Sequence, residues 1–333
     1  MSSTALIIGV SSQDGSYLAD LLLGKGYQVV GTIRRSTNFY QENITHLIGK
    51  IQVEAADLID GESIAQVIRK YQPDEVYNIA AQSVPADSWS HPYYTGEVTA
   101  LGAVRVLEAV RHHASKARVY QATSREIFGN ITGVANETTP IDANNPYGIA
   151  KAYAHMMARC YRESYGIFAC AGILFNHESP RRSLHFVTRK ITAAVACIKN
   201  QVKQPPLDEL GKPLVSNHQL SLGWLDSQRD WGYAPEYVEA MWRMLQNSEP
   251  KDYVIGTNIA HTVRDVCQIA FAHVGLDWEE HVKTDSHLLR PTEIAALTGD
   301  YTLAQKELGW QPRTSFETLI RLMVDADLER FQR

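Results

Sequence analysis

The sequence has 333 residues, of which 44% are hydrophobic and 21% are charged, a composition typical of a folded globular protein. The net charge is −5 and the isoelectric point is about 6.2, so the chain lacks the overall basic field that gathers nucleic acid or an anionic membrane. No nucleic-acid or membrane partner is expected, and any anionic ligand must be held by local groups.

The N-terminus and the cysteines indicate a cytoplasmic protein. The first apolar run ends at Gly9 and is too short for the core of a signal sequence or for a membrane span. The cysteines form no CxxC pair and are expected to be buried thiols in a reducing compartment, and no metal site is predicted. The four cysteines are Cys160, Cys170, Cys197 and Cys267.

From residue 5 onward, short β-rich apolar runs alternate with segments of helical period. This alternation is typical of a parallel sheet covered by helices. We therefore expect an α/β fold, a Rossmann-type doubly wound parallel sheet, with a smaller and mainly helical C-terminal substrate lobe. A stretch rich in turn residues at 203–221 predicts an inserted surface loop. The predicted strands cover residues 5–10, 28–33, 51–55, 75–80, 118–122 and 168–175, and the predicted helices cover residues 16–25, 99–112, 147–163, 263–274 and 315–331.

The turn after the first predicted strand has the pattern of a dinucleotide site. Gly9 and Gly15 stand at its ends, where a Cβ would block the approach of a pyrophosphate to the N–H groups of the helix N-terminus. Ser12 replaces the middle glycine of the usual GxxGxxG motif, so the prediction depends on the position of the turn between a strand and an amphipathic helix. The alternative is an ordinary strand-to-helix turn. The cofactor-binding residues predicted here are Gly9, Ser12, Gln13, Asp14 and Gly15.

The end of the second predicted strand indicates which dinucleotide binds. An acid usually stands there to bind the ribose of NAD, but this sequence has Arg34 and Arg35. Two guanidinium groups suit the 2′-phosphate of NADP, so NADP is the predicted cofactor, and a solvated arginine pair is the alternative. Further residues follow the next two strands, with Asp57 and Leu58 expected near the adenine, and Ala80, Ala81, Gln82 and Ser83 near the nicotinamide half.

Tyr147 and Lys151 are four residues apart and share one face of a predicted helix. A lysine held near the phenol is expected to lower the pKa of the tyrosine from about 10 toward neutrality, so that the phenol can remove a hydroxyl proton. Ser124 could donate a hydrogen bond to the same oxygen. Both members of the pair are also expected to contact the cofactor. The alternative is an amphipathic helix with an exposed lysine and a half-buried tyrosine.

Glu126 lies two residues beyond Ser124 and provides a second acid/base group. Plain alcohol oxidation needs no such group, whereas β-elimination of water from a 4-keto sugar requires one, which favours a dehydratase over a dehydrogenase. The alternative is a carboxylate paired with Arg125 or with solvent. The predicted catalytic residues are Ser124, Glu126, Tyr147 and Lys151.

Longer segments resemble one family of nucleotide-sugar enzymes over nearly the whole chain. The most specific are the strings NHESPRR at residues 176–182 and RDWG at residues 229–232. On these segments the chain resembles the GDP-mannose 4,6-dehydratase family, which belongs to the extended short-chain dehydrogenases/reductases. Further segments that carry the resemblance lie at residues 13–18, 80–83, 145–148, 172–175, 188–191, 237–242 and 290–293.

The resemblance implies a redox-neutral conversion of GDP-mannose, or a closely related GDP-sugar, to the GDP-4-keto-6-deoxy sugar. Tyr147 takes the proton of the 4-hydroxyl while hydride leaves carbon 4 for NADP. Glu126 then assists loss of the carbon 5 proton and the 6-hydroxyl, and the hydride returns to carbon 6. A homo-oligomer, either a dimer or a tetramer, is also implied. The substrate-binding residues implied by the resemblance are Ser83, Asn176, Glu178, Lys190, Arg229, Arg290 and Glu293.

Other functions remain open on the sequence. An NADPH-dependent reductase or 4-epimerase of a GDP-sugar needs the same serine, tyrosine and lysine but seldom an acid at Glu126. A non-catalytic cofactor-binding homologue would fit the unusual residues Ser12 and Arg125. Most departures from the family's pattern lie around the substrate, so the reaction type is better supported than the exact sugar. The departures are Ser12, Asn43, Ser124, Arg125, Ser183, Trp224, Gln228 and Ala295, together with the loop at 203–221.

These motifs predict two domains. Residues 1–175 are expected to form the NADP-binding Rossmann domain with the catalytic residues. Residues 176–333 are expected to form mainly the lobe that binds the nucleotide sugar, with some segments returning to the Rossmann domain. Ligands of open α/β sheets bind along the carboxyl ends of the strands, so the site is expected where the two domains meet.

Overall fold

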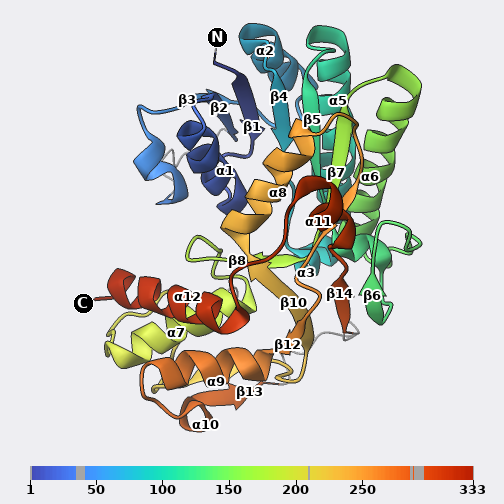
Figure 1. The fold of residues 1–333 in the computed structure, drawn as a ribbon. Helices are drawn as coiled ribbons and strands as arrows, with labels where there is room; N and C mark the ends of the chain where they lie inside the picture. The colour runs from blue at the N-terminus through green and yellow to red at the C-terminus, as the bar shows by residue number, and fades with distance from the viewer. Residues whose placement is uncertain (1, 35–41, 209–210, 286–287, 289–295, 333) are drawn as a thin grey trace.

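The fold is built on one sheet of seven parallel strands (Figure 1). A computed structural model describes residues 2–34, 42–208, 211–285, 288 and 296–332. The strand order is β11-β7-β5-β4-β1-β2-β3, so that β4 returns to pair with β1 on the side opposite to β2. The doubly wound parallel sheet predicted from the sequence is confirmed. Its strands are β1 Thr4–Ile8, β2 Gln28–Ile33, β3 Gln52–Ala55, β4 Glu75–Asn78, β5 Arg118–Ser124, β7 Ala169–Leu174 and β11 Tyr253–Ile255.

Two layers of helices cover the sheet because its strands present apolar side chains to both faces. Along β1, Ala5 and Ile7 pack with the layer formed by α1, α8 and α11, whereas Leu6 and Ile8 pack with α2, α5 and α6. The alternation of side chains along a strand thus supplies two separate cores. The helices are α1 Gln13–Gly24, α2 Gly61–Tyr71, α5 Gly102–His113, α6 Pro146–Tyr165, α8 Ala234–Gln246 and α11 Thr302–Leu308.

A smaller lobe lies below the sheet in the view of Figure 1 and has an apolar core of its own. Its helices α7, α9 and α12 pack together around buried side chains that include Trp231. Two segments between parts of this lobe, α8 and β11, return to the large sheet. Further elements are α7 Val187–Lys199, α9 Val263–His273, α10 Trp278–His281, α12 Phe316–Arg330, β8 Asn176–Glu178, β9 Leu220–Leu222, β10 Gln228–Tyr233, β12 Ala260–Thr262, β13 Val282–Thr284, and the paired strands β6 Gly133–Ala135 and β14 Leu297–Gly299. Three short helical segments, η1 Glu42–Leu47, α3 Pro85–Ser90 and α4 Pro92–Thr95, lie in the N-terminal half of the chain.

The predicted elements are present, but some of their ends differ. Helix α1 begins at Gln13 rather than at residue 16, because the Ser12 side chain accepts a hydrogen bond from the N–H of Gly15 and caps the helix three residues earlier. The short strand β11 was not predicted, because a run of three apolar residues carries too little periodicity to be recognised. The helix predicted at 99–112 is a π-helical turn, η2 Gly96–Leu101, followed by α5.

The loop predicted at 203–221 is anchored to the smaller lobe. Its described residues form no helix, and two isolated β-bridges, Leu207 with Pro213 and Ser216 with Gln219, fold it back on itself. Buried side chains from this stretch join the apolar core of the lobe. Within the described part of the chain, no helix has the length and apolarity needed to cross a membrane.

Candidate active site

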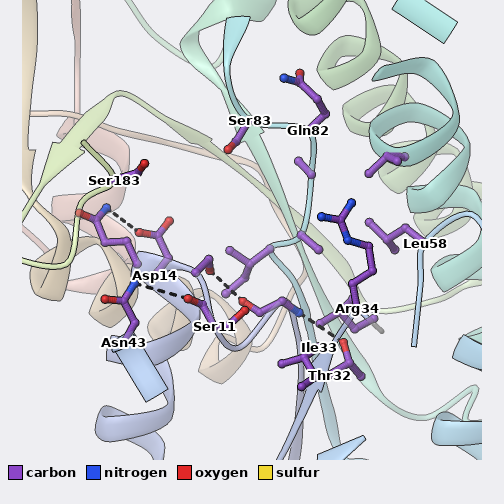
Figure 2. Close-up of a pocket in the computed structure, with 18 of the residues that line it drawn as sticks. Ser11, Asp14, Thr32, Ile33, Arg34, Asn43, Leu58, Gln82, Ser83 and Ser183 are labelled. Carbon is purple, nitrogen blue, oxygen red and sulfur yellow. Dashed lines mark hydrogen bonds between the residues drawn. The ribbon is translucent and has the colours of Figure 1, made fainter. Parts of the chain in front are cut away.

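A cleft of about 590 Å³ opens where the strand order of the sheet reverses, next to the ends of β1, β2 and β4 (Figure 2). This is the place where open α/β sheets bind nucleotides. Most residues predicted to bind the cofactor line it. Gly15 is in the first turn of α1 behind the lining, Tyr147 and Lys151 line the adjoining cavity described below, and Arg35 lies outside the described residues. The predicted residues that line the cleft are Gly9, Ser12, Gln13, Asp14, Arg34, Asp57, Leu58, Ala80, Ala81, Gln82 and Ser83.

The turn between β1 and α1 is shaped by its two glycines. Gly9 has a φ of +95°, and a Cβ on Gly15 would lie 2.3 Å from the carbonyl oxygen of Gly9. Ser12 closes the turn, since its Oγ donates to the Gly9 carbonyl at 2.8 Å and accepts from the Gly15 N–H at 3.0 Å. Ser12 is therefore the N-cap residue of α1. The N-terminus of this helix fits the pyrophosphate of a dinucleotide.

The opposite end of the cleft has a charged and an apolar part. Figure 2 shows the Arg34 side chain extending beside Leu58, and its Nη1 donates a hydrogen bond to the Tyr94 hydroxyl. Apolar side chains around it suit the flat face of a base. These apolar lining residues are Ile33, Ala56, Leu58 and Val98.

A second cavity, of about 140 Å³, adjoins the cleft and contains all four predicted catalytic side chains. Ser124 ends β5, Glu126 lies in the short 3₁₀ helix η3 Arg125–Phe128, and Tyr147 and Lys151 lie on the first turns of α6. The two spaces share Asp14, Ile79, Ala81, Ser83, Arg182 and Phe186 as lining residues, so a molecule in the cleft can reach the catalytic cavity.

The proton affinity of the tyrosine differs from the sequence-based expectation. Burial raises the pKa of Tyr147 to about 12, although the hydrogen bond with Ser124 opposes the rise. Lys151 does not offset this effect, because its Nζ donates to the Ala122 carbonyl at 2.9 Å and lies 5.9 Å from the centre of the tyrosine ring. Burial also lowers the pKa of Lys151 to about 8. The prediction of a tyrosine pKa near neutrality is thus wrong for the protein alone, because desolvation outweighs the cation.

Glu126 is held by the residue that caps the catalytic helix. The Asn145 side chain accepts from the N–H of Gly148 at 2.8 Å and so begins α6, while its amide nitrogen donates to Glu126 Oε2 at 2.9 Å. A Cβ on Gly148 would lie 2.5 Å from the Glu126 carbonyl, so glycine is needed for this close packing. One side chain therefore fixes the acid relative to Tyr147.

Sequence reasoning missed an ion pair in the cavity wall. The Asp14 carboxylate lies 2.8 Å from Nε2 of His177, which follows β7 at the start of the smaller lobe. Burial opposes ionisation of both groups, but their mutual attraction prevails, so that the pKa of Asp14 is lowered and that of His177 is raised. The pair connects the glycine turn to the smaller lobe. The only signal in the sequence was the membership of His177 in the string NHESPRR.

Only some of the substrate-binding residues implied by the resemblance line the catalytic cavity in the structure. Ser83 and Asn176 line the catalytic cavity. Glu178 is buried, accepts a hydrogen bond from Thr188 and pairs with Arg182, so it supports the cavity wall from behind. Lys190 and Arg229 are on α7 and β10 and line neither the cleft nor the cavity. Arg290 and Glu293 lie outside the described residues.

Comparison with known sequences gives matches over nearly the full length. Residues 6–323 match the family described as GDP-mannose 4,6 dehydratase. The chain is 46% identical to GDP-mannose 4,6 dehydratase 2 of Arabidopsis thaliana, with 99% of this chain and 88% of the relative covered. It is 41% identical to GDP-mannose 4,6 dehydratase of Homo sapiens, with 98% and 92% covered. The family is therefore shared across distant organisms.

Solved structures share the fold at lower identity. The chain resembles DesIV (dTDP-glucose 4,6-dehydratase) from Streptomyces venezuelae with NAD and TYD bound, at a TM-score of 0.83 and 20% identity over 98% of this chain and 97% of that one. It also resembles RMD from Pseudomonas aeruginosa complexed with NADPH, at a TM-score of 0.81 and 17% identity over 99% and 100%. These similarities establish a common fold.

Proposed function

The chain belongs to the GDP-mannose 4,6-dehydratase family, and on that premise we propose that it converts GDP-mannose to the GDP-4-keto-6-deoxy sugar and water. The observation that carries the proposal is the meeting of Ser124, Glu126, Tyr147 and Lys151 around one cavity beside a dinucleotide cleft. A hydro-lyase of this kind needs one acid/base group for the 4-hydroxyl and another for the elimination. The cavity contains both.

Each residue has a separate part in the proposed reaction. NADP bound in the cleft supplies a hydride acceptor for carbon 4, a hydride donor for carbon 6 and, when oxidised, a positive charge near the phenol. Tyr147 takes the proton of the 4-hydroxyl, and Ser124 donates a hydrogen bond to the same sugar oxygen. Lys151 adds positive charge beside the deprotonated phenol.

Glu126 acts in the elimination step. Its carboxylate takes the proton from carbon 5, the carbon–oxygen bond at carbon 6 breaks, and a double bond forms between carbons 5 and 6. The proton on Glu126 passes to the departing oxygen, which leaves as water. Return of a hydride to carbon 6 is then accompanied by addition of a proton at carbon 5, which balances the proton that Tyr147 removed from the 4-hydroxyl. Asn145 donates a hydrogen bond to one oxygen of the Glu126 carboxylate. Glu126 itself lines the cavity in which the sugar would react.

The second candidate function is an NADPH-dependent reductase or 4-epimerase of a GDP-sugar, which uses the same serine, tyrosine and lysine. Glu126 favours the dehydratase, because it lines the reaction cavity and is tied to the cap of α6 rather than facing solvent. We also keep three expectations as proposals: a homo-oligomer, a cytoplasmic location, and a substrate lobe formed mainly by residues 176–333.

We expect a mass-spectrometric assay to decide between these functions. Purified protein is incubated with GDP-mannose, first without and then with added NADP. Loss of one water from the nucleotide sugar without net use of cofactor supports the dehydratase. An isomer of unchanged mass that separates from GDP-mannose by chromatography supports a 4-epimerase, and stoichiometric oxidation of NADPH in a parallel sample with a GDP-4-keto sugar supports a reductase. GDP-mannose recovered without change from both samples rules out this sugar as the substrate.

We propose that the protein prefers NADP to NAD because of Arg34. This residue directly follows β2 and lines the cleft. We expect Arg34→Ser to weaken NADP binding by about 10- to 100-fold through loss of charge-assisted hydrogen bonds to the 2′-phosphate, with little change for NAD. Equilibrium titration of nucleotide-free protein with both dinucleotides measures this. Arg69→Ser, which removes an exposed arginine of α2, is the matched control. An equal loss of affinity for NAD and NADP would show that Arg34 does not read the phosphate.

A further inference from the structure

Arg125, next to the proposed base, is an unusual residue for the wall of a reaction cavity. It lines the catalytic cavity, and its side chain is only 4% exposed. Burial of a cation is unfavourable unless partners compensate it, and burial indeed lowers the pKa of Arg125. A buried arginine at this position therefore needs a structural or functional reason.

The guanidinium has few partners. Its Nη1 lies 3.4 Å from Glu126 Oε1, and its Nη2 donates to the Gly129 carbonyl at 3.1 Å. Its buried Nε has no hydrogen-bond partner among the described residues. The Gly129 carbonyl is in a fixed place, because Gly129 has a φ of +66° and a Cβ there would lie 2.0 Å from the Asp142 carbonyl oxygen. The turn thus anchors one arm of the guanidinium and leaves the other beside the carboxylate.

The contacts on Glu126 come from two sides. Arg125 is next to Oε1, and Asn145 donates to Oε2. The backbone adds a third restraint, because the N–H of Glu126 donates to the Ser124 hydroxyl oxygen at 3.2 Å. Since these contacts leave the carboxylate little freedom, its direction relative to Tyr147 is set before substrate arrives.

The other charged groups of the cavity are engaged elsewhere. Lys151 of α6 donates to the Ala122 carbonyl, His177 of β8 pairs with Asp14 of α1, and Arg182 pairs with Glu178. Among the described cations that line the cavity, Arg125 is the one that forms an ion pair with Glu126. A base that removes a carbon-bound proton must be directed at that proton, and the paired guanidinium restrains one oxygen of the carboxylate.

We propose that Arg125 is a positioning residue for water elimination: together with Asn145, it holds the Glu126 carboxylate in one direction within the cavity. The catalytic part of this inference rests on the proposed function, whereas its structural part rests on the ion pair alone.

The catalytic part is tested with Arg125→Ser and Arg125→Lys in the holoenzyme with GDP-mannose. Stopped-flow absorbance of reduced nicotinamide follows oxidation at carbon 4, and quenched samples followed by mass spectrometry report water loss. We expect Arg125→Ser to leave oxidation unchanged and to slow elimination about 10- to 100-fold, because the carboxylate loses one of the contacts that direct it. Arg125→Lys should restore most of the rate. Equal slowing of both steps, or an unchanged elimination, would overturn the proposal.

The structural part is tested without substrate by a double-mutant cycle in thermal unfolding. Arg125→Ser, Glu126→Gln and the double variant should show coupling, because removal of either partner leaves the other buried and unpaired. The exposed pair of Arg159 and Glu163 on α6 provides the control cycle, for which little coupling is expected. Additive shifts at Arg125 and Glu126 would refute the inference even if GDP-mannose were not the substrate, whereas failure of the wild-type protein to dehydrate GDP-mannose would count against the proposed function alone.

Discussion

Tyr147→Phe is expected to lower turnover of GDP-mannose by about 1,000-fold, because it removes the group that starts the reaction. The change removes only the phenolic oxygen, so the buried ring still fills its place on α6. Without that oxygen the cavity lacks the group to which we assign the 4-hydroxyl proton, while Glu126 is assigned to the elimination. Because this proton leaves together with the hydride, reduced nicotinamide should not form on mixing with substrate.

The measurement is a stopped-flow trace of reduced nicotinamide together with the steady-state rate. Tyr153→Phe is the matched control, since Tyr153 lies on the same helix with an exposed side chain that lines neither the cleft nor the cavity. The control should keep its rate. A Tyr147→Phe protein with normal rates would remove the tyrosine from the mechanism.

Glu126→Gln should separate the two halves of the reaction. The amide has the shape of the carboxylate and can still contact Asn145, so binding and oxidation at carbon 4 should persist. It cannot accept the proton from carbon 5, and we expect water loss to fall by about 100- to 10,000-fold. Reduced nicotinamide and a 4-keto sugar that retains its 6-hydroxyl should then accumulate.

Mass spectrometry of quenched samples detects that product, because it is lighter than GDP-mannose by two hydrogens and has not lost water. Glu163→Gln, a change of the same kind at an exposed position of α6, controls for general effects on folding. If Glu126→Gln eliminated water at the normal rate, the dehydratase assignment would lose its second acid/base group, and an epimerase or reductase would become the better-supported function.

Several features of the site could be predicted from the sequence, because they depend on residues that are close together along the chain. The glycine turn requires a tight backbone between a strand and a helix, and glycine at both ends is visible in the residue order. Tyr147 and Lys151 share a face because a helix repeats every 3.6 residues. The resemblance added the segments that match the family, and comparison of whole sequences bears it out.

Other features depended on contacts between distant segments. Asp14 and His177 are 163 residues apart, and only the folded chain makes them a pair. Asn145 caps α6 and also donates to Glu126, and neither of these contacts was predicted from the sequence. Glu178 shared a specific string with residues of the cavity, yet its position on β8 turns it toward Thr188 and Arg182.

The sequence by itself determined the class of the sheet, the location of the dinucleotide turn and the identities of the proposed acid/base residues. These follow from local periodicity and from residue types with few other uses. Only the tertiary structure decided how the groups are charged and held: burial raises the pKa of Tyr147 to about 12, and Arg125 becomes a buried partner of Glu126. The physical reason is that desolvation depends on everything that surrounds a side chain, and most of those neighbours are remote in the sequence.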